Sequence, residues 1–597
     1  MTNVPDHTRR ESLGANRSDI GGGPRQVCRR MAHLTITILA DYCRLTAPTW
    51  GSSRFGTREG IGSVKARSNA ISIVLVLPIL AFVVTLTVPV SAQAPADLPT
   101  GLTPRQRGHE LVPDPDAVAR AKEAAAQAAE GDSVAKPEIN VAAPVSLAGF
   151  DGIYDTSTGP PDTTIAVGST RLIEMVNSRF GIYDRSSNLL SEGPLRDLVG
   201  ATSADFISDP QVMWDPETER FFFVIFENHA NGPTSPDEGL AWGFSRNASP
   251  SSAADWCQYF SRFSYAGTSF PDFPRLGDTK GFLLIGTNRF SLSESYLGAD
   301  LAWITKPGPG TKCRSERSFR KGNFTDLRNA DGTQTFTPVP ARQVDGSRDG
   351  WVVATPFPWS APNALTLYRV ERKGAGLALS APASVAVPTY RTPPNAPQAG
   401  TTSSGSPAPY IDTLSGKLTQ AYSSFDPRFG NIAVWTAHTV AGGAGSELRW
   451  YEIDPADLTL DQWGEVSDPT LYAFNGAIAP DRAVDGSQAL FGSAAVLGFS
   501  TSSATSFPAV QMVSKVADNP QSGFVLVTQS PGPNVDFNCF QPTRPACRWG
   551  DYSGAAPDPV ASADSTTGVV WLSNQWNVAS VTDDDVDWRT WNWTARP

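Results

Sequence analysis

From about residue 148 to the C-terminus, short apolar runs rich in Phe, Trp and Tyr alternate with polar turns of Gly, Pro, Asp and Ser. This pattern predicts β-strands joined by tight turns. The clearest example is residues 208–227 (SDPQVMWDPETERFFFVIFE), where a polar turn separates a short strand from an aromatic-rich strand. One hairpin alone leaves a hydrophobic face uncovered, so repeated hairpins predict sheets stacked face to face.

About seven such units follow one another without a long amphipathic helix between them. They begin near Asp162, Ser208, Phe273, Gly350, Tyr410, Gly476 and Arg548. Radial closure hides strand edges. The pattern therefore predicts an all-β fold, a six- or seven-bladed β-propeller with seven favoured, over residues 146–597. A large β-sandwich or two smaller β domains are the alternatives. The aromatic run 588–593 is expected to seal the last blade against a strand from residues 145–156.

The N-terminal part has a different composition. An uncharged apolar run at residues 71–90 follows Lys65 and Arg67 and ends in an A-x-A sequence at Ala94, which predicts a secretory signal over residues 65–94. A retained membrane anchor is the rival interpretation. Residues 1–64 are expected to be disordered or a mis-assigned extension. Residues 95–145 are expected to form a flexible Ala/Pro-rich spacer with one helix at 117–129, or alternatively a pro-region.

Removal of residues 1–94 takes away 11 of the 48 Lys and Arg and 5 of the 59 Asp and Glu, which changes the net charge from −11 to −17 (37 minus 54). An acidic surface repels nucleic acid and anionic membranes. We therefore expect a secreted monomer, or a cell-surface one if the apolar run is retained. Its expected partner is an extracellular glycan or glycoconjugate.

Four cysteines remain after cleavage, an even number that predicts disulfides in an exported protein. The favoured pairs are Cys257 with Cys313 and Cys539 with Cys547. No C-x-x-C motif is present and His is scarce, so we expect no zinc at these cysteines.

The segments PPDTTIAVG, FPDFPRLGD, AVWTAHTV, LRWYEI and RWGDYSGAAPDP together resemble secreted bacterial proteins with sialidase-like or BNR-repeat-like β-propellers, mostly uncharacterised. The resemblance covers most of residues 150–597. The sialidase Asp-box is approximated by residues 562–571, with two extra residues between Asp564 and Gly568. The resemblance implies an exo-glycosidase that binds acidic sugars through arginines and uses a Tyr nucleophile with an acid partner.

In a propeller, the inner strand of each blade lines a central channel, so polar residues near the starts of different blades converge on one end of it. Two such carboxylates can serve as general acid and as nucleophile or base. The candidate acids and bases are Asp162, Asp209, Asp278, Asp412 and Asp551, with Tyr410 or Tyr552 as nucleophile and His438 as a further base. The candidate substrate-binding arginines are Arg275, Arg449 and Arg548.

Each candidate also has a structural explanation. Asp before Pro or Gly commonly ends a strand, as we expect for Asp215, Asp426 and Asp558. His438 fits a hydrogen-bonded core histidine, and the arginines fit ion pairs between blades. The acidic run 583–587 is interpreted as a solvated turn, with a structural calcium ion as the alternative, and no cofactor is expected to be required.

Two other functions remain open on the sequence. One is a propeller that binds glycan or protein without catalysis. The other is a lyase or phosphoester hydrolase assisted by a divalent metal.

Overall fold

The computed structural model describes residues 110–129, 142–229, 237–265, 267–308, 310, 312–485, 488–540, 546–560, 565–578 and 587–597. All of them belong to a compact unit that spans Asp97–Pro597. The predicted extension (1–64), the predicted signal (65–94) and much of the predicted spacer lie outside the described residues. Within the described part of the chain, no helix is both long and apolar enough to cross a membrane.

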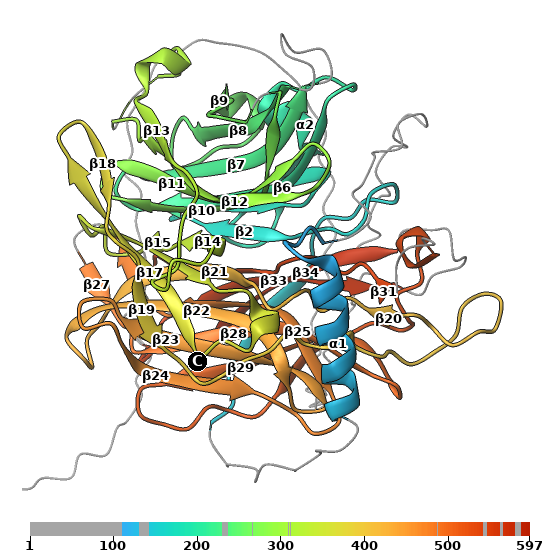
Figure 1. Cartoon of the computed structure of the whole chain (residues 1–597). Helices are drawn as coiled ribbons and strands as arrows, with labels where there is room; N and C mark the ends of the chain where they lie inside the picture. Colours follow the sequence, from blue (N-terminus) through green and yellow to red (C-terminus); the bar gives the residue numbers. More distant parts are fainter. Residues whose placement is uncertain are drawn as a thin grey trace, which may run out of the picture. The chain divides into compact units, whose positions relative to one another are not determined.

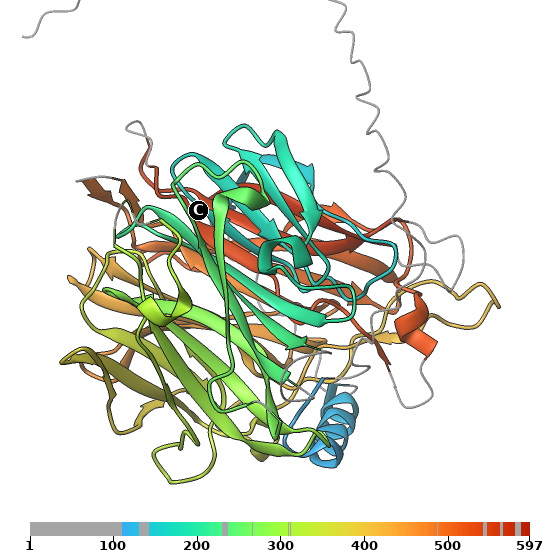
Figure 2. The same cartoon turned by 90° about the horizontal axis from the view of Figure 1, so that it is seen from above.

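Seven antiparallel sheets, each of four or five strands, follow one another along the described residues (Figures 1 and 2). Blades one to three, each from its inner strand outward, are β2 (Thr164–Val167), β3 (Arg171–Met175), β4 (Arg179–Asp184), β5 (Leu189–Pro194); β6 (Phe206–Asp215), β7 (Arg220–His229), β8 (Asp237–Ser245), β9 (Trp256–Ser261); and β10 (Ser269–Thr279), β11 (Phe282–Ser291), β12 (Tyr296–Thr305), β13 (Lys321–Phe324). In blade four the strands are β14 (Phe336–Pro340), β16 (Gly350–Thr355) and β17 (Ala364–Lys373), and β17 pairs with both β18 (Gly376–Leu379) and β19 (Ala383–Ala386). Blade five has β21 (Leu418–Asp426) as its inner strand, followed by β22 (Asn431–Gly442), β23 (Gly445–Asp454) and β24 (Thr459–Val466), and the two-residue strand β15 (Arg342–Gln343) pairs in parallel with β21.

Blades six and seven are β25 (Tyr472–Pro480), β28 (Ala494–Ser503), β29 (Ser506–Val516), β30 (Val525–Gln529); and β32 (Gly554–Pro557), β33 (Val570–Asn577), β34 (Trp588–Arg596), β1 (Val145–Asp151). Two short pairs are β20 (Tyr410–Ile411) with β31 (Ala546–Cys547), and β26 (Ala483–Asp485) with β27 (Gln488–Leu490). The helices are α1 (Pro115–Ala129), α2 (Arg196–Val199), η1 (Ala253–Asp255), η2 (Glu316–Ser318), η3 (Pro358–Ser360) and η4 (Phe537–Phe540).

The inner strands form a closed ring. Each contacts the inner strand of the next blade, and the ring closes where β32 of blade seven contacts β2 of blade one. The seventh blade is completed from both ends of the domain, because β1 pairs with β34 as its outermost strand. The predicted seven-bladed propeller and the predicted closure by the aromatic run 588–593 are both confirmed.

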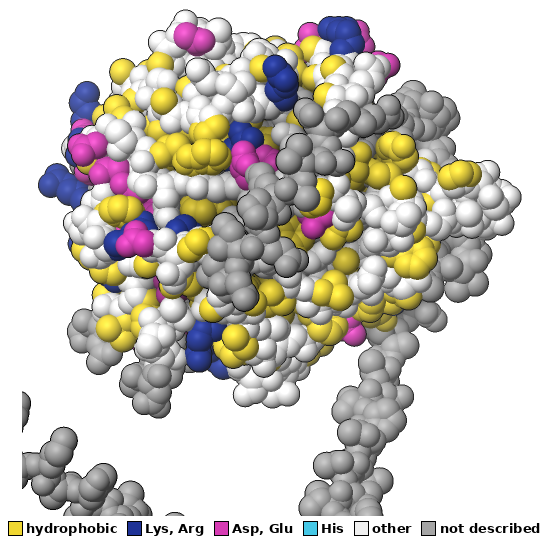
Figure 3. Space-filling view, turned by 90° about the horizontal axis from the view of Figure 1, so that it is seen from below, with side chains coloured by type: hydrophobic (Ala, Val, Ile, Leu, Met, Phe, Trp, Pro, Cys, Tyr) yellow, Lys and Arg dark blue, Asp and Glu magenta, His cyan; other side chains and the backbone are white. Residues whose placement is uncertain are grey.

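The aromatic strand β7 shows why these sequences form blades. Phe221, Phe223 and Ile225 pack in the core cluster shared with blade one, whereas Phe222 and Val224 pack in the cluster shared with blade three. A blade has a neighbour on each face, so both sets of alternating side chains must be apolar. Figure 3 shows the outcome on one face of the molecule, where hydrophobic side chains occur in small groups among polar ones.

Aspartates at the ends of inner strands cap the following turns, as predicted. The backbone N–H groups of Glu217, Arg428 and Val560 donate to the carboxylates of Asp215, Asp426 and Asp558, at 3.2, 2.7 and 2.9 Å. These three aspartates therefore stabilise turns at the ends of their strands.

A β-bulge recurs near the start of the inner strand in blades two, three, four and six. At each bulge a non-glycine residue has positive φ, namely Asp209 (56°), Phe273 (54°), Thr337 (51°) and Asn475 (47°). The N–H of each donates to a side chain of the preceding blade, on Asn177, Asp209, Asn288 and Thr439 in turn. These hydrogen bonds stabilise the positive-φ conformation of the four residues, and they join neighbouring blades at one end of the ring.

Candidate active site at the channel mouth

Seven predicted site residues lie where the inner strands begin, an end of the ring that we call the mouth. Two of them belong to the inner strands β6 and β10, and the others come shortly before β2, β21 or β32. They are Asp162, Asp209, Arg275, Asp412, Arg548, Asp551 and Tyr552. The structure therefore brings these seven positions to one end of the ring, whereas their chemical roles stay predictions.

Asp162 is a buried carboxyl at the mouth, with 3% of its surface exposed and a φ of 50°. One carboxyl oxygen accepts a hydrogen bond from the Nδ2 of Asn177 at 2.8 Å, and the other accepts one from the backbone N–H of Asp551 at 2.6 Å. Burial, followed by the carboxylates of Asp551 and Asp209, raises the pKa of Asp162 well above its ordinary value, although Arg548 opposes the shift. We therefore expect Asp162 to be protonated at neutral pH.

Arg548 joins two other mouth carboxylates. Its Nη1 donates to Asp412 at 3.2 Å, and its Nη2 donates to Asp551. Asp412 also lies 3.1 Å from the Nζ of Lys122. Burial acts to raise the pKa of Asp412, but Lys122 and Arg548 outweigh it and lower this pKa to about 2. Asp412 is therefore ionised at neutral pH, in contrast to Asp162.

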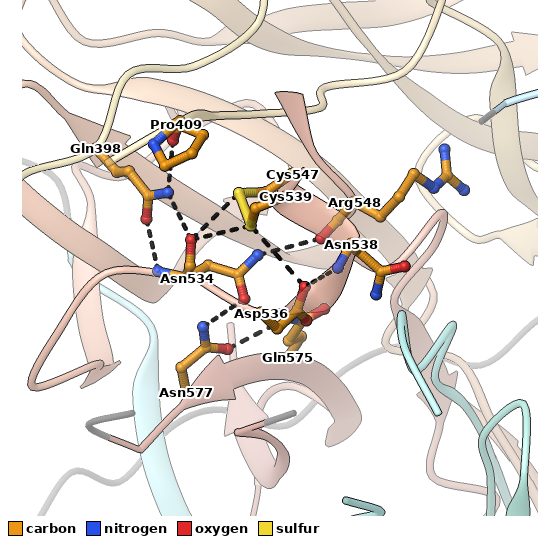
Figure 4. Close-up of a disulfide and its surroundings, with 10 residues drawn as sticks. All are labelled: Gln398, Pro409, Asn534, Asp536, Asn538, Cys539, Cys547, Arg548, Gln575 and Asn577. Carbon is orange, nitrogen blue, oxygen red and sulfur yellow. Dashed lines mark hydrogen bonds between the residues drawn. A yellow bond between two sulfur atoms is a disulfide. The ribbon is translucent and has the colours of Figure 1, made fainter. Parts of the chain in front are cut away.

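The disulfide Cys539–Cys547 helps to position Arg548 (Figure 4). Arg548 directly follows Cys547, and its backbone carbonyl accepts a hydrogen bond from the Nδ2 of Asn534 at 3.2 Å. The backbone N–H of Asp412 donates to the carbonyl of Cys547 at 2.9 Å. These bonds bring Asp412 next to Arg548 from a distant part of the chain. The second predicted disulfide, Cys257–Cys313, is also present.

Arg275 lies buried between two aromatic rings. Its guanidinium carbon is 3.6 Å from the ring centre of Phe273 and 3.8 Å from that of Tyr552. Nη1 donates to the carbonyl of Thr419 at 3.0 Å, and burial lowers the pKa of Arg275 to about 10. The Tyr552 hydroxyl donates to the carbonyl of Pro210 at 3.2 Å, and burial raises the pKa of Tyr552 well above its ordinary value. Arg275 thus remains a cation at neutral pH and stacks on both rings.

Residues 110–129, which we call the covering segment, lie against the mouth. The Glu110 carboxylate accepts hydrogen bonds from the Ser415 hydroxyl at 2.8 Å and lies 3.0 Å from the Nζ of Lys417. The same Nζ is 3.9 Å from Asp551. The Glu110 side chain is only 6% exposed, so the covering segment places a shielded carboxylate against the cationic part of the mouth.

Helix α1, drawn in blue in Figure 1, includes the predicted helix 117–129 and begins two residues earlier. The sequence analysis expected this helix to belong to a flexible spacer. In the structure Val118 is nevertheless buried in a small cluster with Val112 and Phe336, and Lys122 reaches Asp412. A single buried valine and one lysine are too few to form a periodic signal.

Four predicted site residues lie elsewhere. Asp278 is near the opposite end of β10 from the bulge and pairs with Lys306 at 2.8 Å. Tyr410 is 53% exposed on the short strand β20. Arg449 is on β23, two strands outward from the ring, where it pairs with Glu447 at 2.9 Å. His438 is on the second strand of the same blade.

His438 has the geometry of a hydrogen-bonded core histidine. It is 1% exposed, and its two ring nitrogens lie 2.9 Å from the Gly416 carbonyl and 3.1 Å from the Tyr451 hydroxyl. Burial lowers the pKa of His438 to about 3, so the ring is neutral at physiological pH. Both nitrogens are engaged within the blade.

The sequence analysis did not single out four residues that complete the mouth and the ring below it. These are Glu110, Asn177, Arg342 and Lys417. Arg342 donates from Nη2 to Gln211 at 3.0 Å and from Nε to the Leu276 carbonyl at 3.2 Å, so it spans the ring between inner strands. A cavity lies further along the ring and is lined by inner-strand residues that include Ile165, Met213, Arg342, Tyr422 and Ala556.

No protein-family model matches this chain, and no curated protein matches it. Among solved structures, a Hadza microbial sialidase is similar, with 8% identity and a TM-score of 0.34 over 58% of this chain and 64% of that one. A Trypanosoma rangeli sialidase has 10% identity and a TM-score of 0.29 over 76% and 58%. A Penicillium chrysogenum alpha-L-arabinanase has 12% identity and a TM-score of 0.31 over 60% and 93%. The chain spans less than two thirds of the length of both sialidases.

The predicted calcium site at residues 583–587 falls mostly outside the described residues, with Asp587 as its only described member. The structural calcium ion therefore stays a prediction.

Proposed function

We propose that this protein is an exported glycoside hydrolase, sialidase-like in architecture, that removes a terminal sugar at the mouth. The two disulfides are typical of an oxidising compartment and support export. The observation that carries the proposal is the contrast between two adjacent carboxyl groups. Asp162 is buried with a raised pKa, whereas Asp551 is paired with Arg548. Glycosidic cleavage uses two carboxyl groups in unlike environments, one that donates a proton and one that acts as base or nucleophile.

In the proposed mechanism, Asp162 donates its proton to the glycosidic oxygen as the bond to the leaving group breaks. Asp551 stabilises the positive charge that develops on the sugar, and it acts as base or nucleophile. Arg548 holds Asp551 in place through an ion pair. Tyr552 is not the nucleophile in this scheme, because its hydroxyl is buried and its pKa is raised.

The cations at the mouth favour an acidic sugar as substrate. Lys417 already binds one carboxylate, that of Glu110, and Arg548 binds two more. A sugar carboxylate could replace Glu110 at Lys417 once the covering segment moves away. The substrate must displace this segment to reach Asp162.

The position of the covering segment also favours a second function. If the segment remains in place, the mouth is not accessible to substrate and the propeller binds glycan or protein through its outer surface. Leu111, Val112 and Val118 are all buried in the described state, which supports this alternative.

The test of the proposed function is hydrolysis of a panel of fluorogenic glycosides by the purified full chain, including a sialoside and several uronides. We expect turnover of at least one acidic glycoside, unaffected by chelator because the proposed step uses two carboxyl groups. If the folded protein hydrolyses no glycoside of the panel but binds to a glycan array, the binding function is favoured instead.

A further inference from the structure

Blade two carries a group of potential metal ligands that the proposed mechanism does not use. Asp205 immediately precedes the inner strand β6, and Glu227 and His229 lie two residues apart near the end of β7. One donor atom from each of the three side chains lies within 4.8 Å of the others. Because β6 and β7 are antiparallel, the start of β6 and the end of β7 lie at the same end of the blade.

The Glu227 and His229 side chains face each other without a hydrogen bond. The Oε1 of Glu227 and the Nε2 of His229 are buried atoms that have no hydrogen-bond partner, yet they lie 3.1 Å apart. Glu227 is 1% exposed. Two buried polar atoms that both have acceptor character are unfavourable at this distance unless a proton or a cation compensates them.

A shared proton would satisfy only those two atoms. The Asp205 carboxylate is also within reach and is buried, with 9% of its surface exposed. It accepts hydrogen bonds from the backbone N–H and hydroxyl of Thr202, both at 2.8 Å, and these fix its orientation. Two buried carboxylates and one imidazole match the charge and ligand types of a divalent cation better than those of a proton.

The charged side chains that act on Glu227 from the described residues are the carboxylates of Asp205 and Asp237. Asp237 on β8 lies opposite His229 in the register of the β7–β8 pair. Its carboxylate accepts two hydrogen bonds from Arg262, of 2.6 and 2.7 Å. Burial, then Asp205 and Asp237, raises the pKa of Glu227 to about 8. A bound cation would remove this unfavourable accumulation of negative charge.

We infer that Asp205, Glu227 and His229 bind one divalent transition-metal ion, with Zn²⁺ as the best fit. Zinc accepts both imidazole nitrogen and carboxylate oxygen, and three protein ligands leave a fourth position for water or solute. The His229 side chain is 32% exposed, which gives the ion a route from solvent. The ion would fasten the entry of the inner strand β6 to the end of β7.

The test is zinc titration of the chelator-treated full chain by calorimetry at pH 7.5, with Co²⁺ absorption as a probe of the ligands. We expect one equivalent to bind and to raise the melting temperature. The variants Glu227→Gln and His229→Gln should each lose affinity by more than the roughly 10–100-fold that follows loss of an outer-shell partner. The control variant is Glu238→Gln, which alters a carboxyl group on β8 that is not one of the three proposed ligands. This variant should bind zinc with the affinity of the wild type.

Zinc binding that both variants retain would overturn the inference, as would the absence of any zinc binding by the folded wild type. Binding of Ca²⁺ but not Zn²⁺ would overturn the assignment to a transition metal. Affinity should also fall as the pH drops, since protons compete with a metal ion for its ligands. The Co²⁺ spectrum of the wild type reports nitrogen ligation even if a variant fails to fold.

Discussion

Asp162→Asn is expected to lower kcat/KM by about 10²–10⁴-fold, the contribution typical of a positioned general acid. Asparagine has nearly the same shape, and its single carbonyl oxygen can keep one of the two hydrogen bonds that Asp162 accepts from Asn177 and from the backbone of Asp551, but it has no carboxyl proton to donate. The loss should be in kcat more than in KM, because proton donation belongs to the transition state. Steady-state kinetics on the best glycoside of the panel would measure it.

The matched control is Asp184→Asn, the same chemical change in the same blade. Asp184 lies in an exposed turn between β4 and β5, where it accepts hydrogen bonds from Ser186 and Asn188. Its replacement should leave kcat/KM within twofold of wild type, on the order of experimental error for a surface position. Equal activity of Asp162→Asn and Asp184→Asn would remove Asp162 from the mechanism.

Arg548→Met is expected to lower the free energy of unfolding by about 3–5 kcal/mol. Arg548 is buried between Asp412 and Asp551, and its charge also opposes the raised pKa of Asp162. Methionine fills part of the space but leaves buried carboxylates without their main cation. Urea unfolding followed by tryptophan fluorescence would measure the change.

The control for this variant is Arg369→Met. Arg369 pairs with Asp349 and Glu371, but its side chain is 46% exposed, so its loss should change stability by only about 0–1 kcal/mol. Adding Asp551→Asn to Arg548→Met should restore part of the lost stability, since one unpaired charge is then removed. If Arg548→Met lowers the free energy of unfolding no more than Arg369→Met does, the proposed electrostatic role of Arg548 is contradicted.

The repeated hairpins were enough to predict the blades. The blades have apolar side chains on both faces, and an aspartate caps the turn after the inner strand in blades two, five and seven, so the strand and turn signals recur along the chain. The closing strand and the disulfide pairs also followed from sequence, because aromatic content and cysteine number are local properties. Asp162, Asp209 and Asp551 were placed at one end for the same reason, as each lies near the start of an inner strand.

The other site residues could not be placed from sequence because their position depends on which end of a strand they occupy. Asp209 and Asp215 lie on the same strand with the same D-P context, yet Asp209 is at the mouth and Asp215 caps the opposite end. Asp278, like Asp215, lies toward the end of its strand that is opposite the mouth. Glu110 was missed because its contacts, Ser415 and Lys417, are about 300 residues away and no local pattern links them.

The central claim is that Asp162 carries a proton at neutral pH, and infrared difference spectroscopy of the carboxyl C=O stretch tests it most directly. Because the pKa of Asp162 is raised, the folded wild type at pH 7 should show a band of a protonated carboxyl group that Asp162→Asn lacks and Asp184→Asn keeps. The band should disappear only at a pH well above the ordinary range of an aspartate. Identical spectra for wild type and Asp162→Asn at pH 7 would mean that Asp162 is ionised and cannot be the general acid.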